Sequence, residues 1–168
     1  MDYKNISKVG VFTALLVVAS WLVIPLPFGV PFSLQPLAVF IIVYMLKKNA
    51  WKSILTYLLL GTLGLPVFAG FSGGIAKLIG PTGGFLFGFL LASLLVFIPK
   101  INDILLGFLE IIIIYFMGIV WFKLYKDMSF FIAFKLLVPP FILWDIIKLF
   151  IAYSITKAVE KRLQIENA

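Results

Sequence analysis

The sequence predicts an all-α integral membrane protein in which six transmembrane helices form a single domain over residues 1–168. The first observation is that hydrophobic residues make up 63% of the chain and charged residues only 12%. With a mean hydropathy of +1.17, this is more apolar side chain than a soluble fold of this size can bury. The second is length: a transmembrane helix needs about 20 apolar residues, so the chain accommodates about six spans and no separate soluble domain.

The first predicted span covers about residues 8–24 and follows a basic amino-terminal segment, an arrangement that a cleavable signal peptide would share. No A-x-A cleavage pattern follows it. Pro25, Pro27 and Pro31 lead directly into the next apolar stretch instead. We therefore predict that this segment stays in the protein as a helix and ends at a tight, uncharged loop.

The remaining apolar stretches are separated by short connections, as expected when consecutive helices cross a bilayer and return. Each stretch is long enough to be a helix that crosses most or all of the hydrocarbon core. We predict these further spans at about residues 34–47, 51–66, 82–98, 103–124 and 130–157.

The distribution of cations predicts the orientation in the membrane, because the cytoplasmic ends of transmembrane helices carry an excess of Lys and Arg. Nine cations fall at one set of predicted span ends and three at the other. This places both termini in the cytoplasm of a multi-pass plasma-membrane protein. The nine are Lys4, Lys8, Lys47, Lys48, Lys52, Lys100, Lys157, Lys161 and Arg162, and the three are Lys77, Lys123 and Lys126.

Glycine is concentrated between residues 64 and 84, on the predicted outer face, where seven glycines occur in twenty-one residues. Non-helical backbone cannot face lipid with unpaired N–H and C=O groups, so this stretch must lie against protein or line a wet cavity. One interpretation is that the glycines merely end helices. The other, which their density favours, is an outward-facing pocket that this glycine-rich loop covers.

Four ionisable residues, Glu110, Lys135, Asp145 and Lys148, lie within predicted spans and are flanked by apolar sequence. A charge at the bilayer centre costs about 2.5–3.5 kcal/mol even on permissive insertion scales, so each should face the bundle interior and have a partner. Glu110 and Lys135 lack an oppositely charged neighbour at helical spacing. We expect them to pair structurally or to lie nearer the membrane interface.

Asp145 and Lys148 are three residues apart, which places them on one helical face within reach of each other. One interpretation is an internal salt bridge that locks the last helix. The other is a polar anchor for a ligand, because a carboxylate and an ammonium together offer acceptors and donors to N–H groups and to carbonyl or carboxylate oxygens. The predicted glycine-rich cover favours the ligand anchor.

Gly10 and Ala14 form a small-x-x-x-small pair on the first predicted span. Such pairs let a second helix approach closely. The second helix belongs either to the same bundle or to a partner protein, and the sequence leaves both interpretations open.

The composition excludes several classes of function. The chain has no Cys and no His, so it lacks thiolate chemistry, the commonest general base and the commonest neutral metal ligand. It also has no Gly-x-x-x-x-Gly-Lys-Ser/Thr sequence, so it cannot hydrolyse ATP as a P-loop protein does. We expect no enzyme activity, no metal and no cofactor. The cations at span ends are explained by orientation in membrane lipid, which leaves no basis for nucleic-acid binding.

Two other functions explain parts of the sequence. A small membrane enzyme would use Glu110 and Asp145 as a carboxylate pair on a lipid substrate, but an activated nucleophile is missing. A homo-oligomeric channel or scaffold built by helix packing explains the hydrophobicity but not the glycine-rich loop.

A series of short motifs occurs in order along residues 29–148: Gly29-Val-Pro-Phe-Ser-Leu-Gln35, Tyr57-Leu-Leu-Leu-Gly61, Gly64-Leu-Pro-Val-Phe-Ala-Gly70, Ser72-Gly-Gly74, Gly80-Pro-Thr-Gly-Gly84, Pro140-Phe141 and Asp145-x-x-Lys148. In sequence and spacing this series resembles the BioY family, the biotin-specific S components of energy-coupling-factor (ECF) transporters.

The resemblance implies a six-helix S-component fold in which the glycine-rich loop caps a cavity that captures biotin from outside. It implies three partner subunits, a transmembrane coupling protein and two ATP-binding-cassette ATPases. Asp145 and Lys148 would hydrogen-bond the polar groups of biotin. The other implied substrate-binding residues are Gln35, Phe68, Ser72, Gly73 and Phe85, and the residues implied to face the coupling protein are Gly10 and Ala14.

The chain departs from the family pattern at several positions. Phe85 stands where the family usually has Tyr. Ser72 and Leu86 are neutral, whereas some members carry Arg at each of these positions. The resemblance therefore leaves Lys148 as the cation expected to meet a ligand carboxylate.

Overall fold

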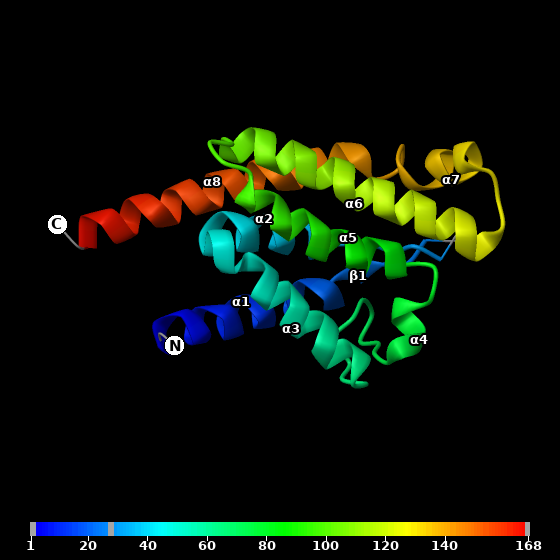
Figure 1. Ribbon diagram of the computed structural model, residues 1–168, viewed down its shortest axis with the longest axis horizontal. Coiled ribbons are helices and arrows are strands. Elements are labelled where there is room, and N and C mark those ends of the chain that lie inside the picture. Colours follow the sequence, from blue (N-terminus) through cyan, green and yellow to red (C-terminus); the bar gives the residue numbers. More distant parts are fainter. Residues whose placement is uncertain (1–2, 27–28, 167–168) are drawn as a thin grey trace.

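The computed structural model describes residues 3–26 and 29–166, and its long helices run roughly along the long axis of the molecule (Figure 1). The long helices are α1 (Tyr3–Trp21), α2 (Gln35–Leu46), α3 (Ala50–Thr62), α5 (Gly83–Leu94), α6 (Asp103–Lys126) and α8 (Ile142–Glu166). The shorter helices are α4 (Ile75–Leu78), α7 (Phe130–Leu137) and the 3-10 turns η1 (Lys47–Asn49) and η2 (Leu95–Phe97).

A small hairpin departs from the all-α prediction. Strands β1 (Val23–Ile24) and β2 (Phe32–Ser33) pair antiparallel between α1 and α2. The proline-rich connection cannot continue as helix because proline lacks an amide hydrogen, so the backbone groups at its two ends pair with each other. Pro27 of this predicted loop lies outside the described residues. The hairpin fixes the position of Phe32 and Ser33 at the start of α2.

The helices occupy the predicted apolar stretches, but most are shorter than a bilayer is thick. Within residues 3–26 and 29–166, α6 is the one helix that is long and apolar enough by itself to cross a membrane. At about 1.5 Å rise per residue, the 12 residues of α2 and of α5 and the 13 of α3 extend less than 20 Å. Turns η1 and η2 extend α2 and α5 by one turn.

The last predicted span, residues 130–157, is not a single helix but a bent pair of helices. Helices α7 and α8 are bent by 54° at the break between them. Pro139 and Pro140 stand in this break, where they remove two amide donors and clash with the preceding turn. After the break, Asp145 and Lys148 in the first two turns of α8 are buried, whereas Leu143 and Trp144 are exposed.

Helix α6 begins and ends at well-defined caps. The Asn102 side chain accepts a hydrogen bond from the Leu105 amide at 2.7 Å, which satisfies one of the free donors at the start of the helix. Asp127 ends the helix in the left-handed conformation with φ of 48°. These caps set the length of α6, which among the described helices is the one that is long enough to span a membrane by itself.

Glycines bring α5 and α6 into close contact. A Cβ atom added at Gly84 would collide with the Trp121 side chain and the Met117 carbonyl of α6, and one added at Gly88 would lie 3.0 Å from the Ile114 Cα. Gly84 and Gly88 are four residues apart and therefore share one helical face. This face lets the two backbones approach as small-residue motifs do in membranes.

Helix α1 packs on α3 through polar as well as apolar side chains. The hydroxyl groups of Thr13 and Ser53 are 3.0 Å apart and buried. Gly10 and Ala14 lie on another face, which is exposed, and a Cβ atom on Gly10 would have nothing within 4 Å. The small pair on α1 therefore makes no close helix contact within the described part of the chain.

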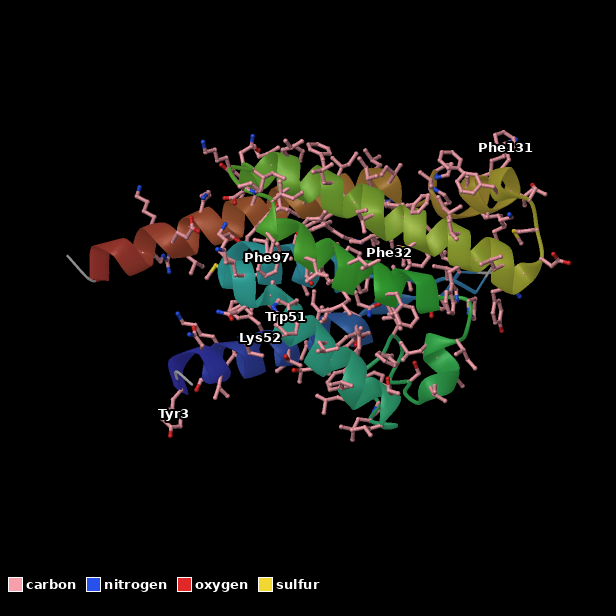
Figure 2. The ribbon with its side chains drawn as sticks, in the orientation of Figure 1. Tyr3, Phe32, Trp51, Lys52, Phe97 and Phe131 are labelled. Atoms are coloured by element: carbon pink, nitrogen blue, oxygen red, sulfur yellow. The ribbon has the colours of Figure 1, made fainter. Side chains whose placement is uncertain are left out.

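The start of α1 and the end of α8 lie at the same end of the molecule, on the left in Figure 1. Figure 2 shows Tyr3, Trp51 and Lys52 toward this end and Phe131 at the opposite end. The α3–α4 loop (residues 63–74), α4 and the hairpin lie away from the end that holds the two termini.

An ion-pair network joins η1, α6 and α8 near the end with the termini. The ammonium nitrogens of Lys47 and Lys157 lie 2.8 Å and 3.0 Å from the two carboxylate oxygens of Asp103. Both lysines are largely solvent-accessible, so each pair contributes at most about 1 kcal/mol. The network adds little stability compared with the apolar packing between the helices.

We predict opposite effects on stability for an added methyl group at two glycines. Gly84→Ala should destabilise the protein by about 1–3 kcal/mol because the Cβ atom collides with α6. Gly10→Ala should leave stability unchanged or raise it by up to about 1 kcal/mol, because the site is open and Ala is the better helix former. Thermal unfolding of both variants in one detergent measures this, and equal shifts would contradict the packing described for α5.

Candidate ligand-binding site

A cavity that is partly open to solvent lies among the hairpin, the α3–α4 loop and helices α2, α4, α5, α6 and α8. These segments meet away from the end of the molecule that holds the termini (Figure 1). Most of the lining is apolar, as in sites that bind small organic molecules. The lining residues are Val30, Pro31, Ser33, Gln35, Pro36, Phe68, Ala69, Lys77, Thr82, Phe85, Leu86, Phe89, Ile114, Tyr115, Phe141, Asp145 and Lys148.

The polar centre of the cavity is a hydrogen-bonded cluster of Tyr115, Asp145 and Lys148. Lys148 Nζ donates to Asp145 Oδ1 at 2.8 Å, and the Tyr115 hydroxyl donates to Asp145 Oδ2 at 2.7 Å. Lys148 Nζ also donates to the Ser33 carbonyl at 2.7 Å. All three side chains are buried, with residue exposures of 5–7%. Buried charges persist only where partners satisfy them in this way.

The hairpin and the α7–α8 break bring this cluster together. Asp145 and Lys148 lie in the first two turns of α8, where the helix dipole favours a carboxylate. Phe32 of β2, labelled in Figure 2, places its ring centroid 4.1 Å from Lys148 Nζ, close enough for a cation–π interaction. Phe32 also stacks on Phe141 from the break, at 6.5 Å between centroids.

Gln35 and Phe68 form a second wall of the cavity, and Tyr57 supports both. The Gln35 amide donates to the Tyr57 hydroxyl at 2.6 Å, while its carbonyl oxygen accepts from the Ser33 hydroxyl at 3.2 Å. The Phe68 ring packs edge-on against Tyr57 with centroids 5.3 Å apart. The orientation of the Gln35 amide is therefore fixed before any ligand enters.

The α3–α4 loop is held against the ends of α1 and α3. The Ser20 hydroxyl and the Trp21 indole N–H each donate to a backbone carbonyl of the loop, and the Gly74 amide donates to the Gly61 carbonyl at 2.7 Å. These bonds satisfy backbone groups that would otherwise be unpaired in an apolar environment. They present Phe68 and Ala69 to the cavity, with the Phe68 ring fully buried.

Ser72 and Gly73 lie outside the cavity lining. The Ser72 hydroxyl donates to the Ala69 carbonyl at 2.8 Å, and the Ser72 backbone exchanges two hydrogen bonds with Phe68. A Cβ atom at Gly73 would collide with the Leu65 carbonyl. These two residues therefore shape the loop that presents Phe68 and Ala69. The other five residues of the predicted set line the cavity directly, namely Gln35, Phe68, Phe85, Asp145 and Lys148.

Phe85 of α5 packs on α6 rather than offering a polar group. Its ring lies edge-on to Tyr115 at 6.3 Å between centroids. Gly118 makes room for it, since a Cβ atom there would collide with the Phe85 ring. Of these two aromatic residues, Tyr115 of α6 supplies a hydroxyl group to the cavity and Phe85 of α5 supplies an apolar ring.

Tyr115 and Lys77 line the cavity but were not predicted from the sequence to do so. Tyr115 follows the run Ile111–Ile114, where an aromatic residue looks like any lipid-facing side chain. Lys77 was expected only to mark the outer face. The available signal for Lys77 was its position inside the glycine-rich stretch, which was itself predicted to cover the pocket.

Of the two alternatives expected for Glu110, a structural pairing or a position nearer the membrane interface, the structure contradicts the pairing. Glu110 is fully buried on α6, and neither of its carboxylate oxygens has a hydrogen-bond partner within residues 3–26 and 29–166. Lys135 is exposed, and its ammonium lies 4.4 Å from the Phe131 ring centroid. Glu110 also lies outside the cavity lining, so it does not join Asp145 there as the carboxylate pair that a membrane enzyme would need.

The arrangement is suited to binding rather than to chemistry on a substrate. The cavity offers carboxylate, ammonium, phenol and amide groups at fixed positions, surrounded by aromatic and aliphatic side chains. Across the part of the chain that the structure describes, no three Asp, Glu, His or Cys side chains gather as a metal site requires. A neutral polar head group attached to an apolar body matches this lining.

Comparison with known proteins agrees with the motif pattern. The model of the BioY family matches residues 1–165. "Biotin transporter BioY" of Thermotoga maritima is 39% identical over 98% of this chain and 99% of its own length. "Probable biotin transporter BioY" of Pyrococcus horikoshii is 37% identical over 95% of this chain and 98% of its own length.

A solved structure shares the fold. The crystal structure of the S-component for biotin from an ECF-type ABC transporter has a TM-score of 0.82, with 23% sequence identity over 95% of this chain and 92% of that one. This likeness shows the fold, and the sequence matches show the family. Because the family model and both relatives cover nearly the whole chain, this membrane protein belongs to the BioY family.

Proposed function

We propose that this chain captures biotin at the outer face of the membrane as the S component of an ECF-type importer. The observation that carries the proposal is the buried Tyr115–Asp145–Lys148 cluster at the polar centre of an otherwise apolar cavity. Biotin combines a ureido group, which has N–H donors and a carbonyl acceptor, with an apolar bicyclic ring and chain. The two relatives are named as a biotin transporter and a probable one, which supports the same ligand.

The ureido group fits the paired charges because it is neutral and bifunctional. Its N–H groups would donate to the Asp145 carboxylate while its carbonyl accepts from Lys148. Charge-assisted hydrogen bonds of this kind are worth roughly 1.5–3 kcal/mol each. Gln35, Phe68 and Phe85 would enclose the ring, and Ser72 and Gly73 would act through the shape of the loop.

The proposed arrangement in the membrane has six transmembrane segments with both termini in the cytoplasm of the plasma membrane. Helices α1, α2, α3, α5 and α6 supply five of them, and the bent pair α7–α8 supplies the sixth. Support comes from the position of both chain ends on one side of the molecule (Figure 1) and from the excess of cations at the corresponding helix ends. The cavity then opens toward the outer half.

The proposed partners are a transmembrane coupling protein and two ATP-binding-cassette ATPases, which would supply the energy that this chain has no nucleotide-binding sequence to provide. The solved structure with this fold is titled as the S-component of an ECF-type ABC transporter, which supports such a module. Gly10 and Ala14 are exposed on α1 with open space beside them. We propose that this face contacts the coupling protein.

The first test is equilibrium binding of biotin to the detergent-purified chain alone. Saturable one-to-one binding of biotin, with no binding of thiamine or riboflavin, is the expected result because the cavity is complete within this chain. Isothermal titration measures it directly. No binding of biotin to folded protein would remove the proposed function.

A second prediction concerns Lys148. Lys148→Met should weaken biotin binding at least tenfold, because the variant loses a charge-assisted donor and leaves Asp145 without its cation. Lys135→Met serves as the control, since Lys135 is exposed outside the cavity. Equal affinities in the wild type and the Lys148→Met variant, at unchanged folding, would exclude the assigned role of the lysine.

A third prediction separates capture from transport. Gly10→Leu should leave biotin binding by the isolated chain unchanged but reduce ATP-dependent biotin uptake into vesicles that contain the complete module, because the larger side chain blocks close helix approach. Ser154→Leu, at an exposed small residue of α8, is the matched control. Normal uptake with Gly10→Leu would argue against this docking face.

A further inference from the structure

The cavity contains a second lysine that the Tyr115–Asp145–Lys148 cluster does not use. Lys77 lies on α4, between the α3–α4 loop and α5, and lines the cavity together with Thr82. Its side chain is half-buried. Within residues 3–26 and 29–166 its ammonium group makes no ion pair or hydrogen bond, so the charge is not committed to another side chain.

Lys148, by contrast, is already compensated. Its charge is balanced by Asp145 at 2.8 Å, and a further donor is taken by the Ser33 carbonyl at 2.7 Å. An anion that approached Lys148 would be repelled by Asp145 at nearly the same distance. The pair is therefore suited to neutral groups that carry both donors and acceptors, and it is poorly suited to a carboxylate.

The charge balance of the lining leads to the same conclusion. Among the lining residues, the cations are Lys77 and Lys148 and the anion is Asp145. Subtracting one negative charge from two positive charges leaves a net charge of +1, located at Lys77. A ligand with one negative charge would therefore be neutralised when it fills the cavity, provided that its charged end reaches α4.

We propose that Lys77 binds the carboxylate of the ligand and fixes its orientation in the cavity. The proposal rests on the proposed function, in which the ligand is biotin. The ureido ring would lie against Asp145 and Lys148, and the carboxylate at the end of the valerate chain would lie against Lys77. This differs from the expectation that Lys148 meets the carboxylate, because the structure shows Lys148 already paired.

The proposal assigns Lys77 a role in specificity. Selection for the acid over neutral derivatives would come from α4, while selection for the ureido ring would come from α8. A bound ligand would touch Lys77 on α4 and the Asp145–Lys148 pair on α8. It would therefore link the glycine-rich α3–α4 loop, which leads into α4, to α8. The two ends of the ligand can then be tested separately.

The experiment compares biotin with biotinamide, in which a neutral amide replaces the carboxylate, on the full chain in detergent. Wild type should bind biotin about tenfold or more tightly than biotinamide. Lys77→Met should weaken biotin binding by about tenfold and change biotinamide binding less than threefold, which removes the preference. Lys77→Arg should retain the preference, and Lys148→Met should weaken the binding of both ligands by similar factors.

A matched control for the loss of a cation is a lysine outside the cavity. Lys123→Met removes an exposed cation from the end of α6, outside the cavity, and should change neither affinity. A wild type that binds both ligands equally, or a Lys77→Met variant that keeps the preference for biotin, would overturn the role of Lys77 while leaving biotin capture intact. Failure of the wild type to bind either ligand would overturn the proposed function as well.

Discussion

A buried ion pair in a largely apolar chain is the interaction on which the rest of the structure depends. Asp145 and Lys148 would be costly inside a membrane protein without further partners, because their mutual attraction has to offset the loss of water around both charges. The structure supplies these partners from two distant segments: the Tyr115 hydroxyl comes from α6, and the Ser33 carbonyl and the Phe32 ring come from β2 of the hairpin. The hairpin, the middle of α6 and the start of α8 must therefore meet at one place.

Close helix packing and a pinned loop make this meeting point a cavity rather than a filled core. Glycines of α5 let it approach α6 at the distance that holds Tyr115 beside Phe85. The α3–α4 loop is hydrogen-bonded to the end of α1, which holds Phe68 in the cavity wall. Rigid walls reduce the ordering that a ligand must impose when it binds, which favours high affinity.

Much of this could be predicted from local sequence, and the exceptions have physical causes. The positions of the helices were predicted from the apolar stretches. The contact between Asp145 and Lys148 was predicted from their spacing, because residues three apart share a helical face. The break between α7 and α8 was missed although Pro139 and Pro140 stand in it, since membrane helices often tolerate proline. For Glu110 a structural pairing was one of two expectations, but neither of its carboxylate oxygens has a hydrogen-bond partner within the described structure.

By itself the sequence determined that this is a membrane protein with a polar pair in its last segment and a glycine-rich stretch between residues 64 and 84, because hydropathy, helical spacing and turn residues act locally. The ordered motifs determined the family resemblance. Only the tertiary structure decided which residues surround the cavity. It brought Tyr115 and Lys77 into the lining and left Ser72 and Gly73 outside, because these placements depend on contacts between segments that are far apart in the chain.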